Sequence, residues 1–172
     1  MPIKVEKASY ACCLVNFVHD QFACGRRFRI LNIVDNVTCE WLAAIPDHSI
    51  SQRRVARELG TIIERRGKPG VIILDHGTKF PSSAMPTFAE QNRSAWHHIA
   101  PGKPMLNGFR ESFNSRMRRE LINRGALLWV GSCARSIAAW LLDYNARRAC
   151  LALGYRTPAA YASQLTATCK RR

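Results

Sequence analysis

The sequence predicts an α/β domain built on a mixed sheet. Short apolar runs separated by turn residues come first, a helical period follows, and a continuous apolar run then precedes further helices. The chain has 172 residues, the length of one domain rather than two. Hydrophobic residues make up 47% of it and charged residues 22%, a balance typical of globular proteins.

The first third of the chain predicts three antiparallel strands. Apolar runs occupy 12–18, 27–34 and 40–45, and the second run is enriched in β-branched residues. Gly25 separates the first two runs, and an Asp-Asn pair at 35–36 separates the last two. Turn residues at such short spacing favour hairpins, so neighbouring strands are expected to pair with each other.

A helix is predicted from Ser51 to about Gly67. Apolar residues recur there at helical spacing, with arginines on the other faces: Val55, Leu59, Ile62 and Ile63. Ser49 or Ser51 is the expected cap, and the Gly-Lys-Pro-Gly stretch that begins at Gly67 ends the helix.

A strand buried on both faces is predicted at 70–77, where the text GVIILDHG is almost continuously apolar. A helix at about 82–92 and a short strand near 95–99 follow. The loop Pro-Gly-Lys-Pro leads into a helix from Met105 with an apolar stripe, and the last predicted helix spans about 133–147. The stripe consists of Phe109, Phe113, Met117 and Leu121. Three tryptophans are expected in the core rather than as base-stacking platforms: Trp96, Trp129 and Trp140.

The charge of the chain indicates a nucleic-acid partner. Lys and Arg number 26 against 12 Asp and Glu, which gives a formal net charge of +14. Arginine dominates, and its planar fork suits phosphate better than a point charge does. The alternative is a generally arginine-rich proteome with no such partner.

Neither a membrane nor a secreted location is predicted. No apolar run approaches the roughly 18 residues of a membrane helix, and the start of the chain lacks a cleavage site for a signal peptide. The 7 cysteines are scattered, without the spacing of a zinc site. We therefore expect buried or bystander thiols in a reducing cytoplasm.

Two acidic residues stand where chemistry is expected. Asp75 ends the buried strand, and ligands gather at strand ends in open α/β sheets. Glu111 lies off the apolar stripe of its helix, with Asn114 or Ser115 and then Arg118 on its own face. A carboxylate beside an amide and an arginine suits a metal next to a phosphate backbone. Each acid taken alone is also consistent with a solvated surface residue.

The sequence motifs around the two acids and near the C-terminus point to a family. Asp75 stands in LDHGTKF, Glu111 in PGKPMLNGFRESFNSRMRRELIN, and YNARRACLALGYRTPAAY follows near the C-terminus. Thirty-five residues separate the two acids. From about Cys13 to Ala162 the chain resembles the catalytic core of DDE transposases of bacterial insertion sequences, which are related to retroviral integrases.

This resemblance implies a ribonuclease-H-like fold: a five-stranded mixed sheet, its first three strands antiparallel, flanked by helices. It also implies DNA strand cleavage and transfer, in which three carboxylates hold two divalent ions, Mg²⁺ or Mn²⁺. Asp75 and Glu111 are the implied metal ligands. Candidate DNA contacts cluster around Glu111: Lys103, Arg110, Asn114, Arg118 and Arg119.

The chain departs from the family at the first acid, whose position is taken by Asn16. An amide carries no charge and cannot bridge two ions as a carboxylate does. Asp20 is a poor substitute, because four residues along a strand span about 13 Å. Asp35 is a second possible substitute. However, the family has an acid of its own at the positions of Asp20 and Asp35, in addition to the catalytic one. The resemblance therefore implies a core whose activity is impaired by Asn16.

The expected organisation is an extension at 1–12, the catalytic core at 13–162 and a basic tail at 163–172. We expect a truncated core that lacks the DNA-binding helices that precede the core in the family. We expect a homo-multimer that binds element ends and target DNA in the bacterial cytoplasm, at the nucleoid. The alternatives are a non-catalytic DNA-binding or assembly remnant of a transposase, and a product with no function.

Overall fold

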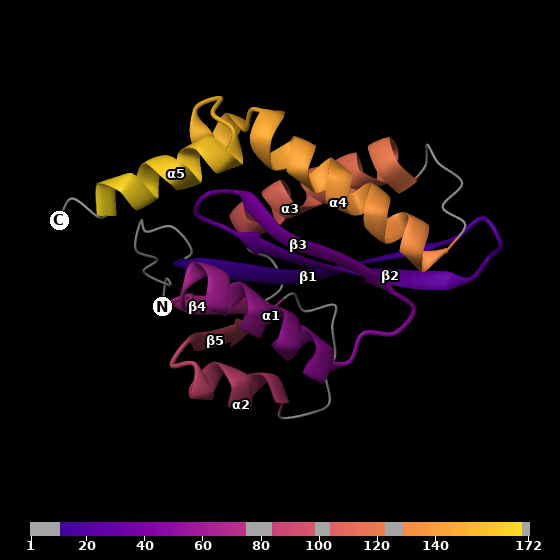
Figure 1. Cartoon of the computed structure of the whole chain (residues 1–172), viewed down its shortest axis with the longest axis horizontal. Coiled ribbons are helices and arrows are strands. Elements are labelled where there is room, and N and C mark those ends of the chain that lie inside the picture. Colours follow the sequence, from indigo (N-terminus) through magenta and orange to yellow (C-terminus); the bar gives the residue numbers. More distant parts are fainter. Residues whose placement is uncertain (1–10, 75–83, 99–103, 123–128, 170–172) are drawn as a thin grey trace.

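The computed structural model describes residues 11–74, 84–98, 104–122 and 129–169. It is a sheet covered by helices on both faces (Figure 1). Helices α1 and α2 pack on one face, and α3 and α4 pack on the other. The α/β class predicted from the sequence is confirmed.

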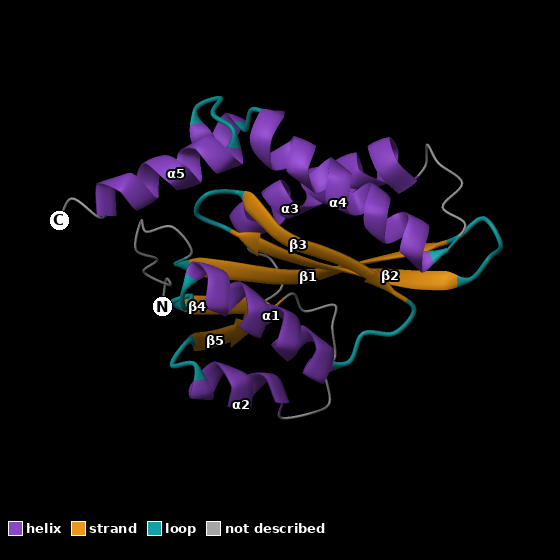
Figure 2. Cartoon of the chain, in the orientation of Figure 1, coloured by secondary structure: helices purple, strands orange, loops and turns teal. Residues whose placement is uncertain are grey.

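The sheet has the strand order β3-β2-β1-β4-β5 (Figure 2). Its strands are β1 (Cys12–Gln21), β2 (Arg27–Asp35), β3 (Glu40–Asp47), β4 (Val71–Leu74) and β5 (Ala95–His98). The first three pair antiparallel, as predicted, while β4 lies parallel to β1 and β5 parallel to β4. The sheet is therefore mixed, with β1 at its centre.

The described residues form five α-helices around the sheet: α1 (Gln52–Arg66), α2 (Ala84–Gln91), α3 (Pro104–Met117), α4 (Val130–Arg147) and α5 (Pro158–Cys169). A π-helical turn continues α3, and a 3₁₀ turn precedes α5. Helix α5 was not predicted from the sequence, because its many small residues give it little helical amphipathicity. Residues 163–169, expected in a basic tail, are helical.

The ends of α1 follow from its sequence. The Ser51 hydroxyl accepts a hydrogen bond from the amide of Arg54 at 3.3 Å, so Ser51 is the cap. Gly67 ends the helix at a φ of 89°, a conformation that glycine adopts without strain. Its buried apolar residues are Val55, Leu59 and Ile62, as the helical period predicts, while Ile63 is only partly buried.

Aromatic side chains form the core between the sheet and the helices α3 and α4. Phe113 stacks on Trp41 and meets Trp140 and Tyr144 edge-on, at centroid distances of 5.1 and 5.0 Å. Met117 is fully buried beside them, which confirms the central part of the predicted stripe. The side chain of Phe109 lies outside the described residues.

The prediction that all three tryptophans are buried is wrong for Trp129. Trp140 is buried, but Trp129 is 55% exposed. It precedes α4, where its ring covers Gly131 and lies 5.6 Å from the guanidinium of Arg135. The side chain of Trp96 lies outside the described residues.

Six cysteines have described side chains, and these form no disulfide with one another. Burial raises the pKa of Cys12 and of Cys133 to about 11, which keeps both thiols protonated. Among the described helices, none has the length and apolar character needed to cross a bilayer.

An ion-pair network fixes the turn that continues the helix of Glu111. Arg148 contacts Asp143 at 3.0 Å and also pairs with Glu120 of the π-helical turn. The indole of Trp140 donates to Glu120 at 3.1 Å. Burial alone would raise the pKa of Glu120, but these hydrogen bonds and the charge of Arg148 outweigh it and lower that pKa.

Phe113→Ala is expected to lower the free energy of unfolding by about 3–5 kcal/mol, because it leaves a cavity among three aromatic rings. The control is Leu142→Ala on α4, whose side chain is 73% exposed, and it should change the value by less than about 0.5 kcal/mol. Urea denaturation measures both. Equal effects would contradict the assignment of Phe113 to the core.

Glu120→Gln is expected to destabilise the fold in a pH-dependent way. Since the pKa of Glu120 is lowered in the fold, its stabilisation is present above the unfolded pKa and is lost as the pH falls through the folded one. The parent should be more stable at pH 7, and the difference should shrink as the pH falls from the ordinary pKa of a glutamate through the lowered pKa of Glu120 in the fold. Urea denaturation at a series of pH values tests this, and a pH-independent difference would contradict it.

Candidate active site

The candidate site lies where β4 ends beside β1. The last residue pair between these strands joins Val15 to Leu74. Asn16 is therefore the next residue on β1, and Asp75 is the next residue of the chain after β4. Asp75, His76 and Gly77, predicted to end the strand, lie outside the described residues.

Asn16 is held inside the fold. It lies between Leu14 and Val18 on the same face of β1, the face that packs under α3 and α4, and it is only 2% exposed. In the antiparallel pairing of β1 with β2, the residue directly opposite is Asn32, which is fully buried. Two amide side chains therefore stand together in an otherwise apolar layer.

A third amide comes from α3. The side-chain nitrogen of Asn32 donates to the side-chain oxygen of Asn114 at 3.5 Å, a long hydrogen bond. The nitrogen Nδ2 of Asn16 and the oxygen Oδ1 of Asn32 are buried without a hydrogen-bond partner among the described residues. Burying an unpaired polar group costs about 1–3 kcal/mol, so this amide cluster (Asn16, Asn32, Asn114) is retained at the expense of stability.

Glu111 lies one turn before Asn114 on the same helix, and it is exposed. Asn114 thus reaches Asn32, the residue opposite Asn16, and Glu111 lies on the same helix. Within the part of the chain that the structure describes, no three His, Cys, Asp or Glu side chains gather as a metal site.

The candidate DNA contacts have different surroundings. Arg118 forms an ion pair with Asp20 at 3.4 Å and donates to the carbonyl of His19 at 2.9 Å, so it ties the turn after α3 to the end of β1. Arg119 is exposed. Lys103 lies outside the described residues, as does the side chain of Arg110.

Neither acid considered as a substitute for Asn16 is available for that role. Asp20 is paired with Arg118. Asp35 is buried, and its carboxylate accepts hydrogen bonds from the amide of Val37 at 2.9 Å and the hydroxyl of Thr38 at 2.8 Å. It therefore shapes the turn between β2 and β3.

Sequence reasoning missed Asn32. The signal was present, because an amide interrupts the apolar run RFRILNIV. Recognising it required the register of the hairpin, which the turn around Gly25 sets and which puts Asn32 opposite Asn16.

Two family models described as integrase core domain match the chain, at residues 6–104 and 92–158. The chain belongs to the integrase core domain family. It is 36% identical over 154 residues to an uncharacterized 31.7 kDa protein of the insertion element IS407 from Burkholderia multivorans, a match covering 90% of this chain and 56% of that protein. It is 34% identical over 152 residues to an uncharacterized 39.2 kDa protein of IS476 from Xanthomonas euvesicatoria, covering 87% and 43%. The predicted resemblance to insertion-sequence transposases is confirmed, and the chain spans about half the length of these relatives.

Solved integrase structures share the fold of this integrase core. The BIV integrase catalytic core aligns with a TM-score of 0.71 at 13% identity, over 95% of this chain and 99% of that one. The HTLV-2 integrase catalytic core, solved with magnesium in a trimeric form, aligns with a TM-score of 0.68 at 14% identity, over 90% and 97%. The ribonuclease-H-like architecture expected from the resemblance is thereby supported.

Asn32→Val is expected to raise the free energy of unfolding by about 1 kcal/mol, because it removes an unpaired buried amide and adds a residue that strands favour. The matched control is Asn145→Val. The Asn145 side chain bonds the backbone amide and carbonyl of Trp41 at 3.0 and 2.8 Å, so its loss should cost about 1–3 kcal/mol. Urea denaturation measures both, and destabilisation by Asn32→Val would show that its amide oxygen is satisfied.

Proposed function

We propose that the chain is the catalytic core of a DDE-type transposase, which binds DNA and uses divalent metal for strand cleavage and transfer, with its activity weakened by Asn16. The observation that carries this is the amide cluster. Two buried polar atoms without a partner among the described residues, Nδ2 of Asn16 and Oδ1 of Asn32, lie in the layer beside the end of β4, where the resemblance puts the family's acids. A structural core would have filled that layer with apolar side chains.

The residues present fit a divalent ion in part. Carboxylate and amide oxygens are the donors that Mg²⁺ and Mn²⁺ accept. Asp75 and Glu111 would hold the ion, and Asn16 could offer its amide oxygen. A pair of ions would face one carboxylate fewer than the family supplies, so this set suits one ion better than two.

A bound divalent ion would supply charge neutralisation at the phosphate and activation of the attacking oxygen. The chain's own residues would orient the DNA. Asn114 lies one turn from Glu111 and carries an amide that can meet a phosphate or a sugar oxygen. Asn32 would act as a positioning residue, because its contact with Asn114 joins the sheet to the helix of Glu111.

DNA contacts are proposed at the positions taken from the resemblance: Lys103, Arg110, Asn114, Arg118 and Arg119. Arg118 is 47% exposed despite its ion pair with Asp20, so part of its guanidinium remains accessible to a phosphate. We further propose that the core extends over 13–162, that it acts as a homo-multimer on element ends and target DNA, and that it works at the bacterial nucleoid.

Asn16→Asp is expected to create metal-dependent stability. A carboxylate at a position only 2% exposed is costly without a counter-ion, so the variant should be less stable than the parent in EDTA. Mn²⁺ or Mg²⁺ should then raise its melting temperature, and much less that of the parent. Thermal unfolding with and without metal measures this. Equal metal effects in both proteins would contradict the assignment of position 16.

Nicking of a labelled DNA duplex with Mn²⁺ tests the reaction itself. Asn16→Asp should cleave faster than the parent, and adding Glu111→Gln should abolish the gain, because that change removes a metal ligand. Activity in the parent would mean that two carboxylates suffice. Silence in both forms, with DNA still bound, would contradict the catalytic proposal and leave a non-catalytic DNA-binding remnant.

A further inference from the structure

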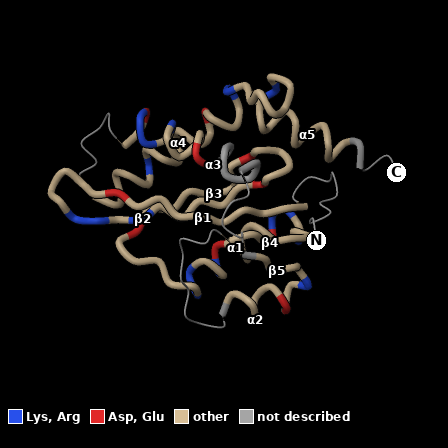
Figure 3. Tube along the Cα trace, turned by 180° about the vertical axis from the view of Figure 1, so that it is seen from behind, with Lys and Arg blue, Asp and Glu red and all other residues tan. Residues whose placement is uncertain are grey.

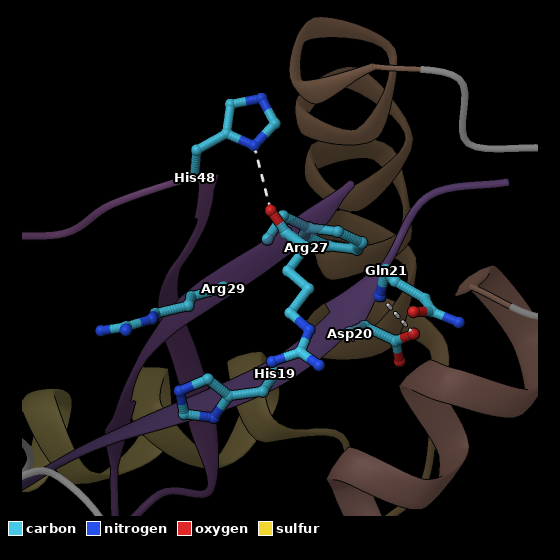
Figure 4. Close-up of a pocket in the computed structure, with 7 residues that line it drawn as sticks. His19, Asp20, Gln21, Arg27, Arg29 and His48 are labelled. Carbon is cyan, nitrogen blue, oxygen red and sulfur yellow. Dashed lines mark hydrogen bonds between the residues drawn. The ribbon is translucent and has the colours of Figure 1, made fainter. Parts of the chain in front are cut away.

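A groove with a volume of about 630 Å³ opens at the end of the β1–β2 hairpin (Figure 4). Its floor contains Phe28, which stacks on Phe22 at a centroid distance of 4.2 Å. The side chains of His19, Arg27, Arg29 and His48 also line the groove. All four of these basic side chains are exposed.

The acids next to this groove are already neutralised. Asp20, which also lines it, pairs with Arg118 at 3.4 Å, and Asp47 pairs with Arg54 at 3.2 Å. Arg27 and Arg29 have no carboxylate within ion-pair distance among the described residues. The groove therefore carries an uncompensated positive charge.

A second hollow of about 380 Å³ adjoins the start of α1 and is lined by two serines and three arginines: Ser49, Ser51, Arg53, Arg54 and Arg57. The first turn of α1 contains no acidic residue. Cations at a helix N-terminus oppose the helix dipole, and an anion bound between them would relieve that repulsion. Because β3 leads directly into this segment, the hollow and the groove lie on the same end of the molecule.

The position of the groove relates it to the candidate active site. His19 follows Asn16 by three residues on β1, which is about 10 Å along the strand. Both lie beyond the point where β4 ends. Figure 3 shows Lys and Arg, in blue, at this end of the β1–β2 hairpin and at the start of α1.

We propose that this hairpin groove and the adjoining arginines of α1 bind the phosphate backbone of duplex DNA that continues past the active site. Exposed arginines spaced along a groove match the regularly spaced charges of a backbone. The surface adds a contact region that the resemblance did not supply, since the residues it implied surround Glu111. This inference rests on the proposed DNA-binding function.

The lowered pKa of His19 is consistent with this charge. Partial desolvation lowers it, and the positive charges of Arg29, its partner across the strand pair, and of Arg118 lower it further. Asp20, the neighbouring acid, is paired with Arg118. A phosphate in the groove would oppose these charges and raise that pKa.

The test compares two triple variants with equal charge change. One carries Arg27→Gln, Arg29→Gln and Arg53→Gln. The control carries Arg65→Gln, Lys68→Gln and Arg93→Gln, three exposed positions at the opposite end of α1 and before β5. The affinity for a short labelled duplex is measured over a series of salt concentrations, after thermal unfolding confirms that both variants fold.

The groove variant should bind about tenfold or more weakly, and its logarithmic salt slope should fall by about two to three, since each lost phosphate contact removes about 0.9. The control should keep the slope of the parent. Equal slopes in the two variants would overturn the inference, because only bulk charge would then matter. A parent that binds no DNA would overturn the proposed function as well.

A measurement of the pKa of His19 in the parent accompanies the DNA-binding comparison. The pKa of His19, followed by proton NMR, should rise when the duplex is added, and the rise should be absent in the groove variant. An unchanged pKa in a saturated complex would overturn the inference. Competition by polyglutamate as strong as that by duplex at equal charge would instead assign the surface to an acidic protein.

Discussion

The register between β1 and β2 is the constraint on which the rest of the structure depends. Side chains alternate between the two faces of a strand, so a shift of one residue would move every amide and apolar side chain to the opposite face. The observed register pairs Cys13 with Asp35 at one end and Gln21 with Arg27 at the other. Asn16 thereby faces α3 instead of α1, and β4 can pair with β1 so that its end lies beside Asn16.

The same register explains why the two faces differ chemically. One side of the sheet packs against α1 with aliphatic residues such as Leu31 and Ile33. The other side combines aliphatic residues with aromatic rings such as Phe113 and Trp41, and it encloses the amide cluster, where two polar atoms have no partner among the described residues. The Arg148–Glu120 pair and the Trp140 indole hold the turn after α3 against α4. The helix of Glu111 is therefore anchored by charge and aromatic contacts at its C-terminal end.

Sequence patterns predicted the elements whose burial is periodic, and failed where periodicity is weak. Alternation and β-branching identified β1 to β3, and the spacing of Val55 and Leu59 identified α1. Helix α5 escaped because small residues give no apolar stripe. Trp129 was placed wrongly because composition cannot show that a helix begins beside it. Asn32 was missed because its role exists only in the pairing with β1, and Asp75 lies outside the described residues.

The metal site and the DNA-binding surface that we propose are physically separable in this integrase core. A carboxylate at position 16 would be buried and would depend on a bound ion for its stability, whereas an amide carries no charge to desolvate. Asn16 therefore removes an electrostatic cost from the fold together with a ligand from the proposed metal site. The charges at the hairpin end are exposed and sit on the surface of the same strands, so this exchange leaves them unchanged. A chain with a weakened metal site can thus keep its full electrostatic attraction for DNA, because that attraction depends on surface arginines and not on the buried layer beneath α3.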